Sequence, residues 1–307
     1  MGDCCVFAGQ GAQVPGMGKD FAESDAELMA LFDKANAVLG FDLKKICFEG
    51  PADELTKSNV CQPAIFVTSY AAFLAFQKRH SAPFAAAAGL SLGEWGALCA
   101  AGALDFDSTL KVLEARGRFM QEASEPAPSG MIAIVGASPA QLDELCAKTG
   151  CTVANVNSAA QQVLSGAKEE IAAAASVAKE FGIKRAIPLA TAGAFHSRFM
   201  APAREKLAPV LDEVTFCAPK IPVLSNVTGK PHSSDPAVIK ATMLEQVTGS
   251  TNWAADIEAA KDLGCARFVE FGPGKVLSGL IKKIDASLTA VNVADLASLD
   301  ATMAALG

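Results

Sequence analysis

The sequence predicts an α/β protein in which a small βαββαβ unit interrupts a larger α/β domain. In the first and the last part of the chain, short apolar runs end in glycine-rich loops and are followed by helical stretches, an alternation typical of parallel α/β folds. Between these parts, strands and helices follow one another more closely, after a proline-rich linker. We therefore predict a large domain formed by residues 1–126 and 195–307 and an inserted subdomain formed by residues 127–194.

The first part of the large domain begins with a buried strand and a tight loop. Residues 4–8 form a short apolar run that ends in the loop Gly9-Gln10-Gly11-Ala12-Gln13, as expected of a strand followed by a turn. The other elements predicted in this part are a helix at 63–78, a strand at 84–90, a helix at 95–101 and a long helix at 105–122.

The linker, residues 125–130, precedes the elements of the inserted subdomain. These are a strand at 131–135, a helix at 139–148, strands at 152–155 and 162–164, a helix at 168–181 and a strand at 184–189. Their order is that of the ferredoxin-like arrangement. The larger pattern then resumes with strands at 221–225 and 267–271, and Gly272-Pro273-Gly274 leads from the second of these into a helix at 275–284.

Composition and charge exclude several function classes. The chain has 307 residues, of which 51% are hydrophobic, so it can bury a sizeable core. Its net charge of −7 argues against a general nucleic-acid binder, although an acidic protein partner could dock on a local basic patch. The nine cysteines form no C-x-x-C pair and there are only three histidines, so we predict no metal site and a reducing compartment.

No segment of the sequence predicts a membrane span or a secretory signal. The longest apolar stretch, residues 64–76, is interrupted by Thr68 and Ser69 and is too short to cross a bilayer. The N-terminus lacks a basic region. We expect a soluble protein of the cytoplasm, or of an organelle stroma or matrix (plastid or mitochondrion) if a transit peptide was removed.

The motif Gly89-x-Ser91-x-Gly93 lies between a predicted strand and a predicted helix, which is the form of a nucleophile elbow. The two glycines keep side chains from colliding at the sharp turn that exposes the serine. The backbone amide of Leu92 would then lie at a helix N-terminus, where it could donate to an oxyanion. An ordinary glycine-rich turn is the alternative interpretation.

A nucleophilic serine needs a base, and the sequence offers His80, His196 and His232. His80 lies at a charged helix end and His232 follows the turn Gly229-Lys230-Pro231, so both look solvated. His196 comes just after the last strand of the insert. We therefore favour His196 as the base.

The glycine loop at residues 9–13 does not fit a nucleotide site. A dinucleotide fingerprint needs glycine where Val14 stands, and no Gly-Lys-Ser/Thr of a P-loop follows. The loop's backbone amides could instead form half of an oxyanion hole. Arg116 lies on the apolar face of the helix at 105–122, so its guanidinium must either reach solvent or meet a carboxylate, and its fork would suit a substrate carboxylate.

Six motifs, spread nearly from end to end, occur in the order found in one known family. They are Gly9-Gln10-Gly11-Ala12-Gln13, Gly89-Leu90-Ser91-Leu92-Gly93-Glu94, Glu114-Ala115-Arg116-Gly117-Arg118-Phe119-Met120-Gln121, Asn155-Val156-Asn157-Ser158, Phe195-His196-Ser197 and Glu270-Phe271-Gly272-Pro273-Gly274. The chain thus resembles the malonyl-CoA:acyl carrier protein transacylases of type II fatty acid synthesis.

This resemblance implies an α/β-hydrolase-like large domain that holds a ferredoxin-like subdomain. It also implies an enzyme that moves the malonyl group of malonyl-CoA to the phosphopantetheine thiol of acyl carrier protein through a malonyl-serine, with no cofactor or metal. By the same resemblance Ser91 is the nucleophile and His196 its base, and the backbone amides of Gln10 and Leu92 form the oxyanion hole.

The resemblance further implies that Arg116 holds the free carboxylate of malonate. In the family a backbone carbonyl orients the histidine, and Gln246 is at the matching position. The segment Gly193-Ala194-Phe195-His196 is similar to the malonyl-selective version of this region. Two residues depart from the family: Leu90 stands where histidine is usual, and Ala8 where proline is usual. Leu90 removes a polar contact beside the nucleophile, so we expect it to affect the rate more than the reaction.

Two other function classes remain open. The elbow alone fits a serine esterase or thioesterase, although such enzymes usually carry the histidine close to the C-terminus. A carrier-binding module that keeps the fold without turnover is the second alternative. We expect a monomer, and an acidic carrier protein could dock on one of four basic pairs: Lys44-Lys45, Lys78-Arg79, Lys184-Arg185 or Lys282-Lys283.

Overall fold

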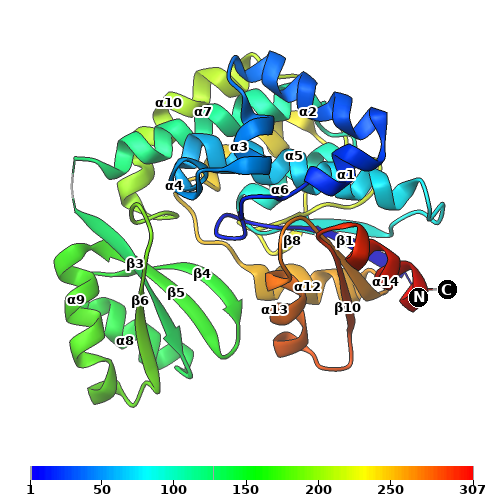
Figure 1. Ribbon diagram of the computed structural model, residues 1–307. Coiled ribbons are helices and arrows are strands. Elements are labelled where there is room, and N and C mark those ends of the chain that lie inside the picture. Colours follow the sequence, from blue (N-terminus) through cyan, green and yellow to red (C-terminus); the bar gives the residue numbers. More distant parts are fainter. Residues whose placement is uncertain (1, 127, 307) are drawn as a thin grey trace.

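The computed structural model describes residues 2–126 and 128–306 and shows an α/β fold with two main sheets, each packed against its own helices (Figure 1). The larger sheet is built from the first and last parts of the chain, and the smaller sheet from the part between them. The predicted domain boundary at residue 127 lies outside the described residues.

The larger sheet has four strands in the order β10-β9-β1-β2, and all neighbouring pairs are parallel. Its strands are β1 (Gly2–Phe7), β2 (Ala86–Gly89), β9 (Cys265–Phe271) and β10 (Thr289–Val293). Successive side chains of β1 enter different cores, with Cys5 and Phe7 on one face and Cys4 and Val6 on the other. Both faces of this sheet are therefore buried, as expected of a parallel sheet covered by helices.

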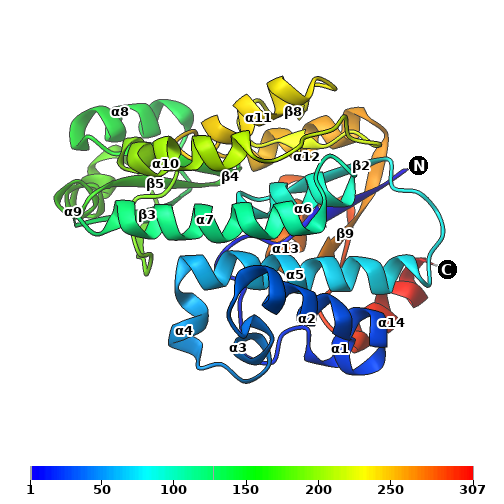
Figure 2. The same ribbon diagram turned by 90° about the horizontal axis from the view of Figure 1, so that it is seen from above.

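Helices cover both faces of the larger sheet. The three that pack around the site are α5 (Ser58–Gln77), α6 (Leu92–Ala100) and α7 (Phe106–Ser124). Figure 2 shows α5, α7 and α10 (Ala201–Asp212) lying side by side. The remaining helices on this side are α1 (Lys19–Ser24), α2 (Ala26–Leu39), α3 (Leu43–Glu49), α4 (Ala52–Thr56), α10 (Ala201–Asp212) and α11 (Pro236–Glu245). The opposite face is covered by α12 (Trp253–Asp262) and α13 (Val276–Ile284), while α14 (Leu296–Leu306) packs on β10.

The smaller sheet is antiparallel, with the strand order β4-β5-β3-β6. Its elements are β3 (Ser129–Val135), α8 (Pro139–Thr149), β4 (Thr152–Ser158), β5 (Gln161–Ala167), α9 (Lys168–Val177) with the 3₁₀ turn Ala178–Phe181, and β6 (Arg185–Leu189). Ile132, Ile134 and Leu164 form a core with the two helices. Met131 and Val163 point from the opposite face toward the larger domain.

Several elements begin or end away from their predicted positions. The strand expected at 221–225 is reduced to β7 (Leu224–Ser225), which pairs with β8 (Lys230–Pro231). Its link to the larger sheet is an isolated bridge between Val223 and Ala87. Pro222 has no amide hydrogen for a sheet ladder, which explains the short strand. Helix α5 begins five residues before the expected start at Pro63, and α6 begins directly after Ser91 rather than at Trp95.

Helix α5 contains the apolar stretch that looked too short to cross a membrane. The helix Ser58–Gln77 has 20 residues, and the mean hydropathy of its most apolar 18-residue window is 1.3, so it is long and apolar enough to do so by length and composition. However, 83% of its most apolar window is buried inside the fold, as in the core helix of a globular protein.

Candidate active site

Ser91 lies on a sharp turn between β2 and α6, and its backbone has the unusual dihedral angles φ 56° and ψ −105°. Two glycines make this turn possible. A Cβ atom on Gly89 would lie 2.0 Å from the carbonyl carbon of Gly93, and one on Gly93 would lie 2.1 Å from the carbonyl oxygen of Phe7. The Gly-x-Ser-x-Gly spacing is therefore required by the close packing of α6 against β1 and β2.

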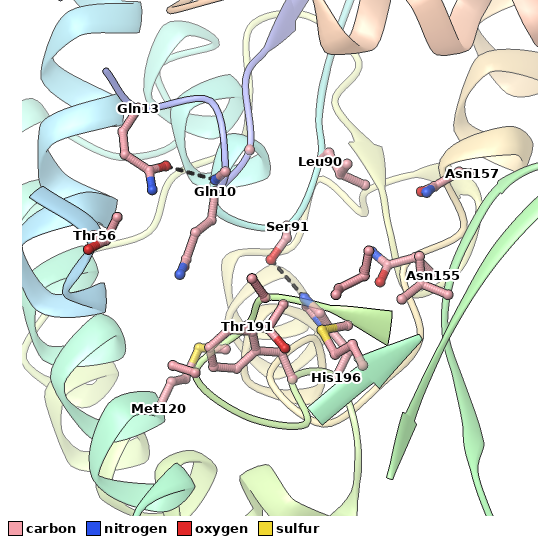
Figure 3. Close-up of a pocket in the computed structure, with 18 residues that line it drawn as sticks. Gln10, Gln13, Thr56, Leu90, Ser91, Met120, Asn155, Asn157, Thr191 and His196 are labelled. Atoms are coloured by element: carbon pink, nitrogen blue, oxygen red, sulfur yellow. Dashed lines mark hydrogen bonds between the residues drawn. The ribbon is translucent and has the colours of Figure 1, made fainter. Parts of the chain in front are cut away.

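His196 faces the serine, and its Nε2 lies 2.7 Å from Ser91 Oγ (Figure 3). Its other ring nitrogen, Nδ1, lies 2.9 Å from the carbonyl oxygen of Gln246 and 3.1 Å from that of Gly249. Since a carbonyl can only accept, Nδ1 carries the proton and Nε2 accepts the hydrogen bond of the serine hydroxyl. Burial lowers the pKa of His196 to about 4, with the nearby charge of Arg116 as a second cause, so the ring is a neutral acceptor at pH 7.

Arg116 on α7 is buried, with 1% of its surface exposed, and its guanidinium points at the serine. One terminal nitrogen donates to Ser91 Oγ at 3.1 Å and to Gln246 Oε1 at 3.0 Å, and the other donates to Gln62 Oε1 at 2.7 Å. Within the described residues the side chain neither reaches solvent nor pairs directly with a carboxylate. Burial lowers its pKa to about 10, so the group remains a cation at pH 7.

Gln10 and Leu92 lie on the two loops that surround Ser91. Gln10 follows β1 and lines the cavity, and its side chain is held by Ser58 and Gln62. Leu92 is the first residue of α6. In the part of the chain that the structure describes, no hydrogen bond to protein is made by either backbone amide, so both remain able to bind an oxyanion.

A cavity of about 460 Å³ opens in front of Ser91, between the two sheets. Figure 3 shows Ser91 and His196 facing each other in it, with Gln10 on one side and Leu90, Asn155 and Asn157 on the other. The smaller sheet supplies part of the wall. A cavity of this size is typical of a small-molecule site.

The prediction that His232 is solvated is wrong. The β7–β8 hairpin turns its ring inward, so that its side chain is 1% exposed and its Nε2 lies 2.7 Å from Glu94 Oε1. His80 is also largely enclosed, with 19% of its side chain exposed near Asp3. Nevertheless, of the three histidines only His196 contacts Ser91.

Two polar residues beneath the serine were not predicted from the sequence. Asn226 accepts a hydrogen bond of 2.7 Å from the backbone amide of Ser91 and donates to Gly89 and Asp256. Glu94 is fully buried and accepts from Gln246 Nε2 at 2.6 Å. A charged residue inside the apolar run of α6 was the available signal for Glu94, whereas Asn226 lies in a loop with no motif.

No carboxylate among the described residues contacts His196, so the orienting groups are backbone carbonyls. Within those residues, no group of three or more His, Cys, Asp or Glu side chains is placed to hold a metal ion. The fold and the site thus define an α/β protein with a serine–histidine pair at a strand-to-helix turn, an arrangement suited to covalent acyl transfer.

A sequence profile described as an acyl transferase domain matches residues 4–299, and the chain belongs to this acyl transferase family. It is 37% identical over 302 residues to a malonyl CoA-acyl carrier protein transacylase of Salmonella typhimurium, covering 97% of both chains. It is similar to the crystal structure of a malonyl CoA-acyl carrier protein transacylase from Clostridium perfringens, with a TM-score of 0.95, 37% identity, and coverage of 100% of this chain and 97% of that one.

A further similar structure is a complex of a type II polyketide acyl carrier protein with its malonyl-transacylase. It has a TM-score of 0.95 and 35% identity, and covers 99% of this chain and 100% of that one. The resemblance expected from the sequence motifs is thereby confirmed.

Proposed function

We propose that this chain is an acyltransferase that moves the malonyl group from malonyl-CoA to the phosphopantetheine thiol of an acyl carrier protein, in fatty acid or polyketide synthesis. One observation carries the proposal: Ser91 Oγ is contacted both by the acceptor nitrogen of His196 and by the guanidinium of Arg116. The nucleophile therefore has a base and a carboxylate-binding group beside it. The names of relatives that match nearly the whole chain support the same function.

The proposed reaction has two halves. His196 Nε2 takes the proton of Ser91 as Oγ attacks the thioester carbonyl, and the oxyanion is held by the amides of Gln10 and Leu92. The carbon–sulfur bond then breaks, and coenzyme A leaves with the proton from His196. In the second half the carrier thiol gives a proton to His196 and attacks the malonyl-serine ester, and Ser91 regains its proton.

Arg116 gives the reaction its selectivity for malonyl in this proposal. Its guanidinium has neutral hydrogen-bond partners and a buried Nε atom without a partner, so it can bind the free carboxylate of malonate through charge-assisted hydrogen bonds. An acetyl group has no such carboxylate. Phe195 lines the same cavity, in the segment whose sequence is similar to the malonyl-selective version.

We also propose that the chain combines two known fold types. The strand order β4-β5-β3-β6 with two helices on one face supports a ferredoxin-like subdomain of residues 127–194, inserted in an α/β-hydrolase-like domain of residues 1–126 and 195–307. We propose that the enzyme acts as a monomer, without a cofactor, in the cytoplasm or an organelle stroma or matrix. Leu90 lines the cavity, and its apolar side chain makes no hydrogen bond to the groups that carry out acyl transfer. We therefore propose that it affects the rate rather than the reaction.

Among the four basic pairs, we propose Lys184-Arg185 as the docking site of the carrier protein. Both residues are exposed, and β6 leads from Arg185 to Leu189, which lines the cavity. By contrast, Lys44 and both Lys78 and Arg79 are already engaged in ion pairs. Arg185→Glu should slow transfer to the carrier without slowing acylation by malonyl-CoA, and Lys44→Glu serves as the control.

Intact-protein mass spectrometry after brief mixing with malonyl-CoA tests the function. We expect one malonyl group on the protein, none on Ser91→Ala, and discharge of that group by a carrier-protein thiol. Arg116→Ala should lower the malonylation rate by about tenfold to hundredfold relative to acetylation, the range for a hydrogen bond to a charged group. Arg118→Ala, on the exposed side of the same helix, is the matched control.

Two outcomes of this experiment would favour the alternatives. Loss of the thioester without a protein adduct, and without transfer to the carrier, would indicate a hydrolase with fast deacylation. Neither adduct nor thioester loss would indicate a binding module.

A further inference from the structure

We propose that Glu94 and His232 form a buried positioning pair that orients Gln246 and thereby aligns Arg116 for recognition of the malonyl carboxylate. This inference rests on the proposed function. Neither residue contacts Ser91 or the cavity through its side chain, so both would act through Gln246.

Gln246 connects the parts of the site. Its backbone carbonyl accepts from His196 Nδ1, its side-chain Oε1 accepts from Arg116, and its Nε2 donates to the backbone carbonyl of Ser91 at 2.9 Å and to Glu94 Oε2 at 2.6 Å. The side chain of Gln246 is fully buried. A change in its orientation would therefore disturb the arginine directly and leave the carbonyl that holds His196 in place.

Glu94 gives the amide of Gln246 one preferred orientation. A glutamine amide has nearly the same shape when it is turned by half a revolution, so only its partners distinguish the oxygen from the nitrogen. The carboxylate of Glu94 and the carbonyl of Ser91 accept and do not donate. Turning the amide would place its oxygen against both acceptors and its nitrogen against the donors of Arg116.

The charge of Glu94 acts in the same direction as its geometry. Arg116 is buried among neutral partners, and Glu94 is the carboxylate whose charge favours the guanidinium cation through space. Because the Gln246 amide separates the two groups, Glu94 occupies none of the nitrogens of Arg116, and the Nε of Arg116 is left without a protein partner among the described residues. A direct ion pair would have occupied the nitrogens that malonate needs.

His232 holds the other oxygen of Glu94. Its Nε2 lies 2.7 Å from Oε1, and both side chains are almost fully buried, at 1% and 0% exposed. The backbone amide of His232 is in turn fixed by the carbonyl of Val223 at 2.8 Å. With Oε1 engaged in this way, Oε2 remains directed at Gln246.

The test compares malonyl-CoA with acetyl-CoA as donors for acylation of Ser91, measured by rapid-quench mass spectrometry. For Glu94→Gln, whose new amide can donate to a turned Gln246, we expect the ratio of malonylation to acetylation rates to fall by about tenfold, because a small misplacement of a binding group has large effects on rate. His232→Leu should lower the ratio in the same direction. His232→Gln, which can still donate to Glu94, should restore it.

Glu270→Gln is the matched control, since Glu270 is also buried but accepts only from the start of α13, and it should leave the ratio unchanged. The double variant Glu94→Gln/His232→Leu should fall no further than Glu94→Gln alone, because the pair acts as one unit. An unchanged ratio in Glu94→Gln, or an equal fall of both rates, would overturn the positioning role. Failure of the wild-type protein to become malonylated would instead reject the proposed function.

Discussion

Mildly acidic pH should destabilise the wild-type protein through His196, and His196→Gln should lack this loss. Burial and the charge of Arg116 lower the pKa of His196 from 6.5 to about 4, so below about pH 6.5 the unfolded chain binds a proton that the folded protein does not. The contribution of the neutral ring to the free energy of unfolding is fully present above that pH and is lost as the pH falls toward the pKa of the folded state. At about 1.36 kcal/mol per pKa unit, the free energy of unfolding falls by about 2 kcal/mol between pH 7.5 and pH 5.

Urea unfolding followed by circular dichroism at these two pH values measures this loss as a difference between the two proteins. Contributions of the carboxylates that they share cancel in the difference. The free-energy gap between them should shift by about 2 kcal/mol in favour of His196→Gln at the lower pH. Ser91→Ala keeps the buried ring and should follow the wild type. A gap that is the same at both pH values would refute the conclusion that the folded protein holds the ring neutral.

Three further results are expected. In the same urea titration, Gly93→Ala should lower the free energy of unfolding by at least about 1–3 kcal/mol, because the new methyl group meets backbone atoms. Gly279→Ala, in an open position of α13, should instead raise it by about 0.5–1 kcal/mol. Burial and a neighbouring carboxylate raise the pKa of Asp256, so the stability linked to this group falls as the pH rises above the ordinary pKa range of an aspartate. In thermal unfolding near pH 7.5, Asp256→Asn should therefore be at least as stable as the wild type. At malonyl-CoA concentrations well below saturation, where the rate reports the pKa of the free protein, the rate of Ser91 malonylation by rapid quench should fall less than about threefold between pH 7.5 and pH 5, since His196 is still mostly neutral there. A steep fall near pH 6.5 would contradict the depressed pKa.

Local signals in the sequence predicted the parts of the fold next to the elbow. Three elements carry their pattern within a few residues: the apolar run of β1, the apolar run of β2 and the helix after Ser91. The structure forms all three. The strand expected at 221–225 was largely wrong because its apolar pattern includes Pro222, whose missing amide hydrogen interrupts the ladder. The first turn of α6 was missed because glycine at position 93 resembles a loop residue until its packing against β1 is known.

The polar groups beneath the serine could not be predicted because they come together only through tertiary structure. His232 follows a sequence typical of an exposed turn, and nothing within that turn shows that the hairpin folds its ring onto Glu94. Likewise, the position of Arg116 on an apolar helix face does not indicate whether its guanidinium has hydrogen-bond partners. Its two glutamine partners lie 54 and 130 residues away in sequence. Resemblance to a family supplied residue roles at such positions, but only for residues that belong to its motifs.

The position of Arg116 links substrate selection to the strength of the base. Its charge is one of the causes that depress the pKa of His196, and Nδ1 of that ring is held by neutral carbonyls rather than by an anion that would offset the charge. In the proposed reaction, the malonyl carboxylate cancels the charge of Arg116 when it binds. The pKa of His196 then rises toward its ordinary value, and the ring becomes a stronger base for Ser91. An acetyl group leaves the charge uncompensated and the base weak. The same arginine therefore favours malonyl twice, once by binding it and once by strengthening the base only when it is bound.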